Sequence, residues 1–373
     1  MVDVRMTWWW GRQPPGPMAP RVGLPVVVGT MALAVGTMAL AVGLGGMSGC
    51  GANGSGLNAA KAKPPTEVSA GDPLVVVTTV APLTSIVSAV VGDRAEVVGV
   101  VPEGTNSHTF EPQPSVAKVL SRADVIFING LQLEEPVRRL AETNRAEGTP
   151  IVALGERTIT ADQYIFDESF PEAEGRPNPH LWTNPLLVGR YAQIVAEQMT
   201  ALDPAGSAVY QANLSAFAGR IEAFDVALRA AFATIPADQR KLLTYHDAYA
   251  YFADEYGWEI IGAIQVSDFG DPTAKEVAAL IDQVRATGVR AIFGSEVFPS
   301  PVLEQIGKEA GVAYIDELRD DDLPGRPGEA EHSLLGLLRF DFITLTEALG
   351  GDASALQAFE LRQSTPDGAV YPQ

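Results

Sequence analysis

The chain has 373 residues, of which 46% are hydrophobic and 19% are charged, as is typical of an ordered globular protein. It carries 26 Lys and Arg against 46 Asp and Glu, which gives a formal net charge of −20. This acidic balance argues against nucleic acid as a partner, because phosphates require basic patches, and it is compatible with the attraction of cations.

The N-terminal segment has the features of an export signal. Three arginines precede a stretch that begins at Val22 and carries no charge until Lys61, and its apolar part is followed by MSGC with Cys50, the only cysteine. Two small residues followed by Cys, after an apolar run, resemble the lipobox of bacterial lipoproteins. We therefore expect a signal peptide over 1–49, a lipidated Cys50 and a flexible tether over 50–72. The alternative is an uncleaved transmembrane helix, because the apolar run is long enough to span a bilayer.

From Pro73 onward, short apolar runs alternate with helical stretches. Four runs rich in β-branched residues predict buried strands, and amphipathic segments between them predict helices. Asn184 followed by Pro185 is a helix start signal, because the Asn side chain can cap and Pro fits the first helical position. We expect a first α/β lobe over 73–203, with strands over 74–80, 95–101, 124–130 and 150–154.

The pattern then repeats after one unusually long helix. Residues 204–235 continue as a helix until Pro236, and we interpret this segment as a stiff connector between two lobes. A polar loop over 316–332 and a last helix over 333–351 follow the strands of the second lobe. This lobe spans 236–373, with strands over 241–246, 258–264, 289–295 and 312–316. Strands that alternate with helices indicate βαβ units, so the predicted fold class is α/β with two parallel sheets.

The chain has four histidines, and three of them fall at the ends of predicted elements. His108 lies in the loop GTNSHTFEPQPS after a strand, His180 precedes a helix, and His246 ends the strand KLLTYH. Asp316 ends the strand VAYID. Ligands of open parallel sheets bind beyond the carboxyl ends of the strands. Three imidazoles and one carboxylate are a typical ligand set for a divalent transition metal. Taken singly, His246 could also be a structural strand-end residue, and His180 could cap the following helix.

Several longer stretches resemble one protein family. The chain is similar to the metal-binding solute-binding proteins of zinc and manganese ABC transporters, the cluster 9 or A-I group. The stretches that carry the resemblance are VVTTVAPLTSIVSAVVGD, GTNSHTFEPQPS, ADVIFINGLQLE, NPHLWTNP, TYHDAYAYFADEYG, PTAKEVAALIDQVRATGVRAIFGSE and YIDEL. The resemblance implies two α/β lobes joined by one long rigid helix, with the metal in the cleft between the lobes. It also implies that His108, His180, His246 and Asp316 bind the metal.

Some positions depart from the family or are open to two interpretations. Ser107 stands before His108 where the family usually has Pro. Glu296 matches a family Glu that would orient a ligand, and a structural role at a helix start is the alternative. The family's zinc members often have a His-rich acidic loop, whereas this chain has no histidine there. We expect that loop (167–174) and the acidic run Asp320–Asp322 to be solvated, while His332 lies in a polar acidic loop and its role stays open.

The ligand set favours Zn²⁺, because zinc prefers imidazole nitrogen, and Mn²⁺ or Fe²⁺ is the alternative. By resemblance, the protein is a lipid-anchored monomer on the extracytoplasmic face of the membrane, which delivers metal to a permease driven by an ATPase. Metal affinity is expected to fall as the histidines titrate. Two other classes stay open from the residues alone, a zinc-dependent hydrolase and an adhesin or structural lipoprotein.

Overall fold

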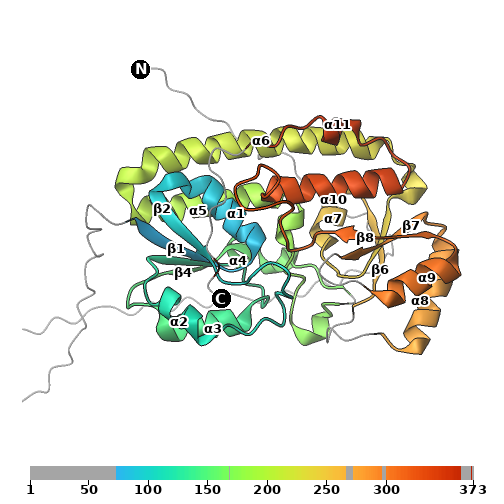
Figure 1. Ribbon diagram of the computed structural model, residues 1–373, viewed down its shortest axis with the longest axis horizontal. Helices are drawn as coiled ribbons and strands as arrows, with labels where there is room; N and C mark the ends of the chain where they lie inside the picture. Colours follow the sequence, from blue (N-terminus) through green and yellow to red (C-terminus); the bar gives the residue numbers. More distant parts are fainter. Residues whose placement is uncertain (1–72, 168, 266–271, 296–299, 363–370, 372–373) are drawn as a thin grey trace, which may run out of the picture. The chain divides into compact units, whose positions relative to one another are not determined.

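The computed structural model describes residues 73–167, 169–265, 272–295, 300–362 and 371 (Figure 1). The expected signal segment, Cys50 and the tether lie outside the described residues. Within the described ranges, no helix combines the length and the apolar character needed to cross a membrane.

The first sheet is parallel and has four strands in the order β2-β1-β3-β4. Its central strands are largely apolar and almost entirely buried, as expected of strands covered by helices on both faces. Its strands are β1 (Leu74–Thr78), β2 (Ala95–Gly99), β3 (Val125–Ile128) and β4 (Ile151–Ala153).

Helices connect these strands, and α5 begins as the sequence predicts. The side chain of Asn184 accepts a hydrogen bond from the backbone N–H of Leu186 (2.9 Å), and Pro185 is the first helical residue. The helices of this lobe are α1 (Ala81–Val91), α2 (Pro114–Leu120), α3 (Glu135–Asn144), α4 (Leu154–Thr158) and α5 (Pro185–Leu202).

The second sheet repeats the topology of the first, with four parallel strands in the order β6-β5-β7-β8. Its strands are β5 (Lys241–Thr244), β6 (Glu259–Ala263), β7 (Ala291–Ser295) and β8 (Ala313–Leu318). Its helices are α7 (Ala250–Tyr256), α8 (Ala274–Thr287), α9 (Pro301–Ala310), α10 (Leu334–Ala348) and α11 (Ser354–Gln357). Two parallel-sheet lobes with one long helix confirm the predicted fold class.

The long helix α6 (Ser207–Ala233) has 27 residues and follows a short 3₁₀ turn over Pro204–Gly206. Figure 1 shows that it runs along both sheets, with α10 beside it. Its buried side chains include Phe217, Phe224 and Phe232, and the ring of Phe232 contacts those of Phe252 and Phe342. This helix therefore packs against both lobes.

One apolar core extends through both lobes. It contains the strands of the first sheet, the buried face of α6, and residues of α7 and α10 such as Phe252 and Phe342. A smaller cluster lies between the second sheet and the pair α8 and α9. Because the larger core includes elements of both lobes, a wide hinge motion would expose apolar surface to water.

Candidate metal centre

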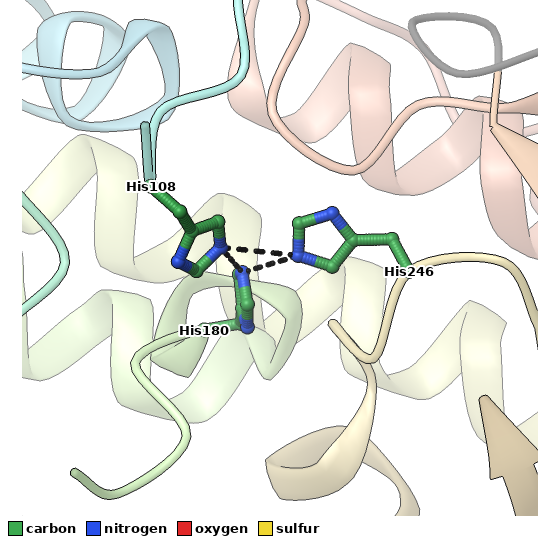
Figure 2. Close-up of side chains that lie close together, drawn as sticks. All are labelled: His108, His180 and His246. Carbon is green, nitrogen blue, oxygen red and sulfur yellow. Dashed lines mark hydrogen bonds between the residues drawn. The ribbon is translucent and has the colours of Figure 1, made fainter. Parts of the chain in front are cut away.

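Three histidines from three separate loops meet at one point (Figure 2). The Nε2 atom of His108 lies 3.1 Å from that of His180 and 3.2 Å from that of His246, and the third pair is 2.9 Å apart. Nitrogen ligands of a tetrahedral zinc, about 2.0–2.1 Å from the metal, lie about 3.3–3.4 Å from one another. The three nitrogen atoms therefore lie close to the spacing that a single metal ion requires.

His180 is oriented by a buried amide. The Oδ1 atom of Asn178 accepts hydrogen bonds from the His180 backbone N–H (3.0 Å) and lies 2.8 Å from His180 Nδ1. The Nδ2 atom of Asn178 donates to Asp167 Oδ2 and to the backbone carbonyl of Asp247, which fixes the orientation of the amide. Since Oδ1 can only accept, Nδ1 of His180 carries the proton and Nε2 presents its lone pair to the centre.

His246 follows the end of β5, and the side chain of Asp320 lies near its ring. Its Nδ1 atom lies 3.8 Å from Asp320 Oδ2, while its Nε2 atom faces the other histidines. The hydroxyl of Thr244 donates to the backbone carbonyl of His246 (2.7 Å) and fixes the turn after the strand. At 3.8 Å Asp320 is too far from Nδ1 for a hydrogen bond, so the hydrogen bond of Thr244 is what fixes the backbone at His246.

His108 lies in the loop after β2 and is only partly buried, whereas His180 and His246 are buried. The side chain of Asn106 accepts a hydrogen bond from the His108 backbone N–H (3.0 Å). The ring of Phe170 lies 5.6 Å from that of His108 and 5.7 Å from that of His180. Trp182, fully buried, contacts His180 from another side. These aromatic rings give the three imidazoles a largely apolar surrounding.

Burial keeps the three imidazoles neutral. It lowers the pKa of His108 and of His180 well below the usual value, and the neighbouring histidines lower both further. Burial also lowers the pKa of His246 to about 4. Neutral imidazole is the form that binds a metal ion, so the cluster is ready to bind at neutral pH without first losing protons.

Asp316 does not join this cluster. It lies within β8, with an exposed side chain, because this strand continues to Leu318 rather than ending at Asp316. The carboxylates that follow the true strand end are Asp320–Asp322. Ligands of parallel sheets bind beyond the carboxyl ends of the strands, and these later carboxylates, rather than Asp316, occupy that position after β8.

The acidic run is buried, so the expectation of a solvated loop is wrong. Asp320, Asp321 and Asp322 are 3%, 8% and 9% exposed, because the loop packs between the lobes. Burial raises the pKa of Asp321 to about 7 and that of Asp322 to about 6. The hydroxyl of Ser107 donates to Asp321 Oδ2 (2.6 Å), while Asp321 Oδ1 is buried and makes no hydrogen bond within the described part of the chain.

The other residues singled out by sequence have different outcomes. His332 is buried within its polar loop, and its Nε2 atom lies 3.8 Å from Glu103 Oε1. In the loop over 167–174, Glu172 and Glu174 are exposed, as expected, whereas Asp167 supports Asn178. Glu296 lies outside the described residues. The neighbouring residues Asn178 and Asp320 were missed, and only the proximity of Asn178 to His180 in NPHLW could have indicated one of them.

Comparisons with a family model, with curated proteins and with solved structures all match proteins that bind or take up metal ions. Residues 76–348 match the family model described as zinc-uptake complex component A, periplasmic. A manganese-binding lipoprotein of Halalkalibacterium halodurans is 26% identical over 302 residues, covering 81% of this chain and 94% of the relative. An iron ABC transporter substrate-binding lipoprotein of Streptococcus pyogenes is 24% identical, covering 72% and 88%. The periplasmic zinc-binding protein TroA of Treponema pallidum superposes with a TM-score of 0.67 at 25% identity, covering 74% of this chain and 99% of that structure.

Proposed function

This chain belongs to the family of zinc-uptake complex component A, and we propose that it is the extracytoplasmic receptor of an ABC metal importer that captures zinc. It is a binding protein and not an enzyme, as are the relatives and the solved structures that share its fold. The observation that carries the proposal is the convergence of three Nε2 atoms within 3.2 Å of one another.

We further propose that Asp321 supplies the fourth ligand in place of the expected Asp316. Asp321 lies in the loop after β8 and is joined to the residue before His108 through the Ser107 hydroxyl. Its second carboxylate oxygen is buried without a hydrogen bond, which is costly unless a cation compensates it. Asp316, by contrast, is exposed to solvent. Histidine nitrogens together with one carboxylate oxygen make a closed four-ligand site, which suits binding rather than catalysis.

Zinc is the metal that this ligand set favours, because imidazole nitrogen dominates it and oxygen ligands are few. The named relatives bind manganese or iron, and a solved structure of the same fold binds zinc. Manganese and iron are therefore the alternatives within the same function. For zinc, manganese and iron alike, deprotonated ligands replace the water shell of the ion.

The proposed location and partners follow from the family. The relatives named as lipoproteins support a lipid anchor at Cys50 of this chain. The protein would then act as a monomer on the outer face of the cytoplasmic membrane, and pass its ion to a permease that is coupled to a cytoplasmic ATPase.

Competitive titration of the metal-free protein with zinc and manganese, followed by calorimetry, tests the proposal. We expect one tight site for zinc that outcompetes manganese. Replacing His246→Ala or Asp321→Ala should weaken zinc binding by more than the roughly 100-fold that a supporting residue costs. Asp316→Ala is the matched control and should bind like the wild type. Loss of binding in the Asp316 variant, with none in the Asp321 variant, would restore Asp316 as the ligand.

A further inference from the structure

The loop that carries His108 is hydrogen-bonded to the acidic loop of the second lobe. The backbone N–H of Gly104 donates to Asp322 Oδ2 (2.6 Å), and the backbone N–H of Leu323 donates to Glu103 Oε1 (3.2 Å). In a third contact between the same loops, the hydroxyl of Ser107 donates to Asp321 Oδ2 (2.6 Å). The position of His108 is therefore coupled to that of Asp321.

The contact of Ser107 differs from the other two, because it occupies one oxygen of the proposed ligand. Ser107 is 2% exposed, so water does not compete for its hydroxyl. The distance of 2.6 Å is typical of a strong hydrogen bond between a hydroxyl and a carboxylate. Only Oδ1 of Asp321 then lacks a hydrogen bond within the described residues, and it is buried. The hydroxyl therefore holds Oδ2 toward Ser107, and Oδ1 is the oxygen that this contact leaves for a cation.

We infer that Ser107 is a positioning residue that holds Asp321 as a one-oxygen ligand and thereby favours zinc over manganese. This inference rests on the proposed function of the site. Three nitrogens and one oxygen make a four-ligand set, which matches the tetrahedral preference of zinc. If the hydroxyl were absent, both oxygens of Asp321 could approach the ion. The ion would then have more ligands, and more of them would be oxygen atoms, which suits manganese better than zinc. A proline, which the family usually has before this histidine, has no side-chain donor and cannot impose the same restriction.

Four variants test the inference in the full-length mature protein. Ser107→Ala removes the donor, and Ser107→Thr retains a hydroxyl at the same place. Glu103→Ala removes a different hydrogen bond between the same two loops and is the matched structural control. Asp321→Ala removes the proposed ligand itself. For each variant, the ratio of zinc to manganese affinity is measured by competition, and the visible absorption of bound Co²⁺ reports the number of ligands.

We expect Ser107→Ala to lower the zinc-to-manganese ratio about tenfold, the scale of one hydrogen bond to a charged group. Its Co²⁺ absorption should weaken, because ions with more than four ligands absorb less strongly than tetrahedral ones. Ser107→Thr and Glu103→Ala should keep the wild-type ratio and spectrum. An unchanged ratio in Ser107→Ala, an equal loss of both metals, or the same shift in Glu103→Ala would overturn the inference. If the wild type bound no metal tightly, the proposed function itself would fail, whereas an unchanged Co²⁺ spectrum in Asp321→Ala would exclude Asp321 as the fourth ligand and overturn the inference alone.

Discussion

Replacing Asn178→Ala should weaken metal binding although this residue is not a ligand. Its Oδ1 atom lies 2.8 Å from His180 Nδ1 and sets which nitrogen of the ring carries the proton. Without that acceptor, the ring can rotate or adopt the other tautomer, and its Nε2 lone pair is no longer fixed toward the centre.

The size of the effect follows from the role of Asn178. Removing the partner that orients a metal-bound histidine costs about 10–100-fold in affinity, which corresponds to about 1.4–2.8 kcal/mol. The substitution also leaves the backbone carbonyl of Asp247 and one oxygen of Asp167 without their donor. A buried group left without its partner costs about 1–3 kcal/mol, so the free energy of unfolding should fall as well.

The assay must separate a loss of affinity from a loss of stability. Asn184→Ala provides the control, because Asn184 is also buried, caps α5 and donates to the backbone carbonyl of Tyr251, but contacts no histidine ring. We expect urea unfolding to show that both variants are destabilised, by about 1–3 kcal/mol. Competitive zinc titration should show weaker binding only in Asn178→Ala. Equal zinc affinities in the two variants would refute the orienting role of Asn178.

Further predictions concern pH, the first ligand and the core. With Asp321 as the proposed fourth ligand, the metal binds its ionised form, and burial raises the pKa of this carboxyl to about 7, so the zinc dissociation constant should increase up to about tenfold per pH unit below 7. Because the pKa of His246 is about 4, Asp321→Asn should flatten that dependence between pH 5 and 7 in a competition assay, and an unchanged slope would contradict the assignment. His108→Ala should abolish the tetrahedral Co²⁺ spectrum; retention of the spectrum would exclude His108 as a ligand. Phe252→Ala should lower the free energy of unfolding by about 3–5 kcal/mol in urea, because its buried ring stacks on Phe342 at 4.5 Å; a loss below about 1 kcal/mol would contradict this packing.

The sequence predicted the features that depend on local pattern. Buried apolar runs predicted the parallel strands, and the pair Asn184 and Pro185 predicted the start of α5. Each of the three histidines follows or precedes a regular element, where ligands of parallel sheets bind, and the family resemblance implied that the histidines of the two lobes meet. No long-range information was needed for this step beyond the topology of βαβ units and the family resemblance.

The carboxylate that follows the end of β8 could not be identified in the same way, because strand ends are uncertain by a few residues in a sequence. A shift from Asp316 to Leu318 in the end of β8 replaces one candidate carboxylate by three others. The burial of Asp320–Asp322 and of His332 depends on the packing of one lobe against the other, and no local pattern encodes it. A run of acidic residues is typical of solvated loops, so the local composition predicted an exposed loop, whereas the structure buries these residues.

The arrangement of core and site indicates how the ion would leave. A single apolar core passes from the first sheet through α6 to α7 and α10, so separating the lobes would expose apolar surface at about 25 cal/mol per Å². The ligand loops, in contrast, are held by a small number of hydrogen bonds, such as those of Gly104 and Ser107 to the acidic loop. Displacing one loop disrupts a few polar contacts that water can replace, whereas opening the whole cleft disrupts the core. We therefore expect the ion to be released by local movement of the loop that carries His108, with little rotation of the lobes about α6.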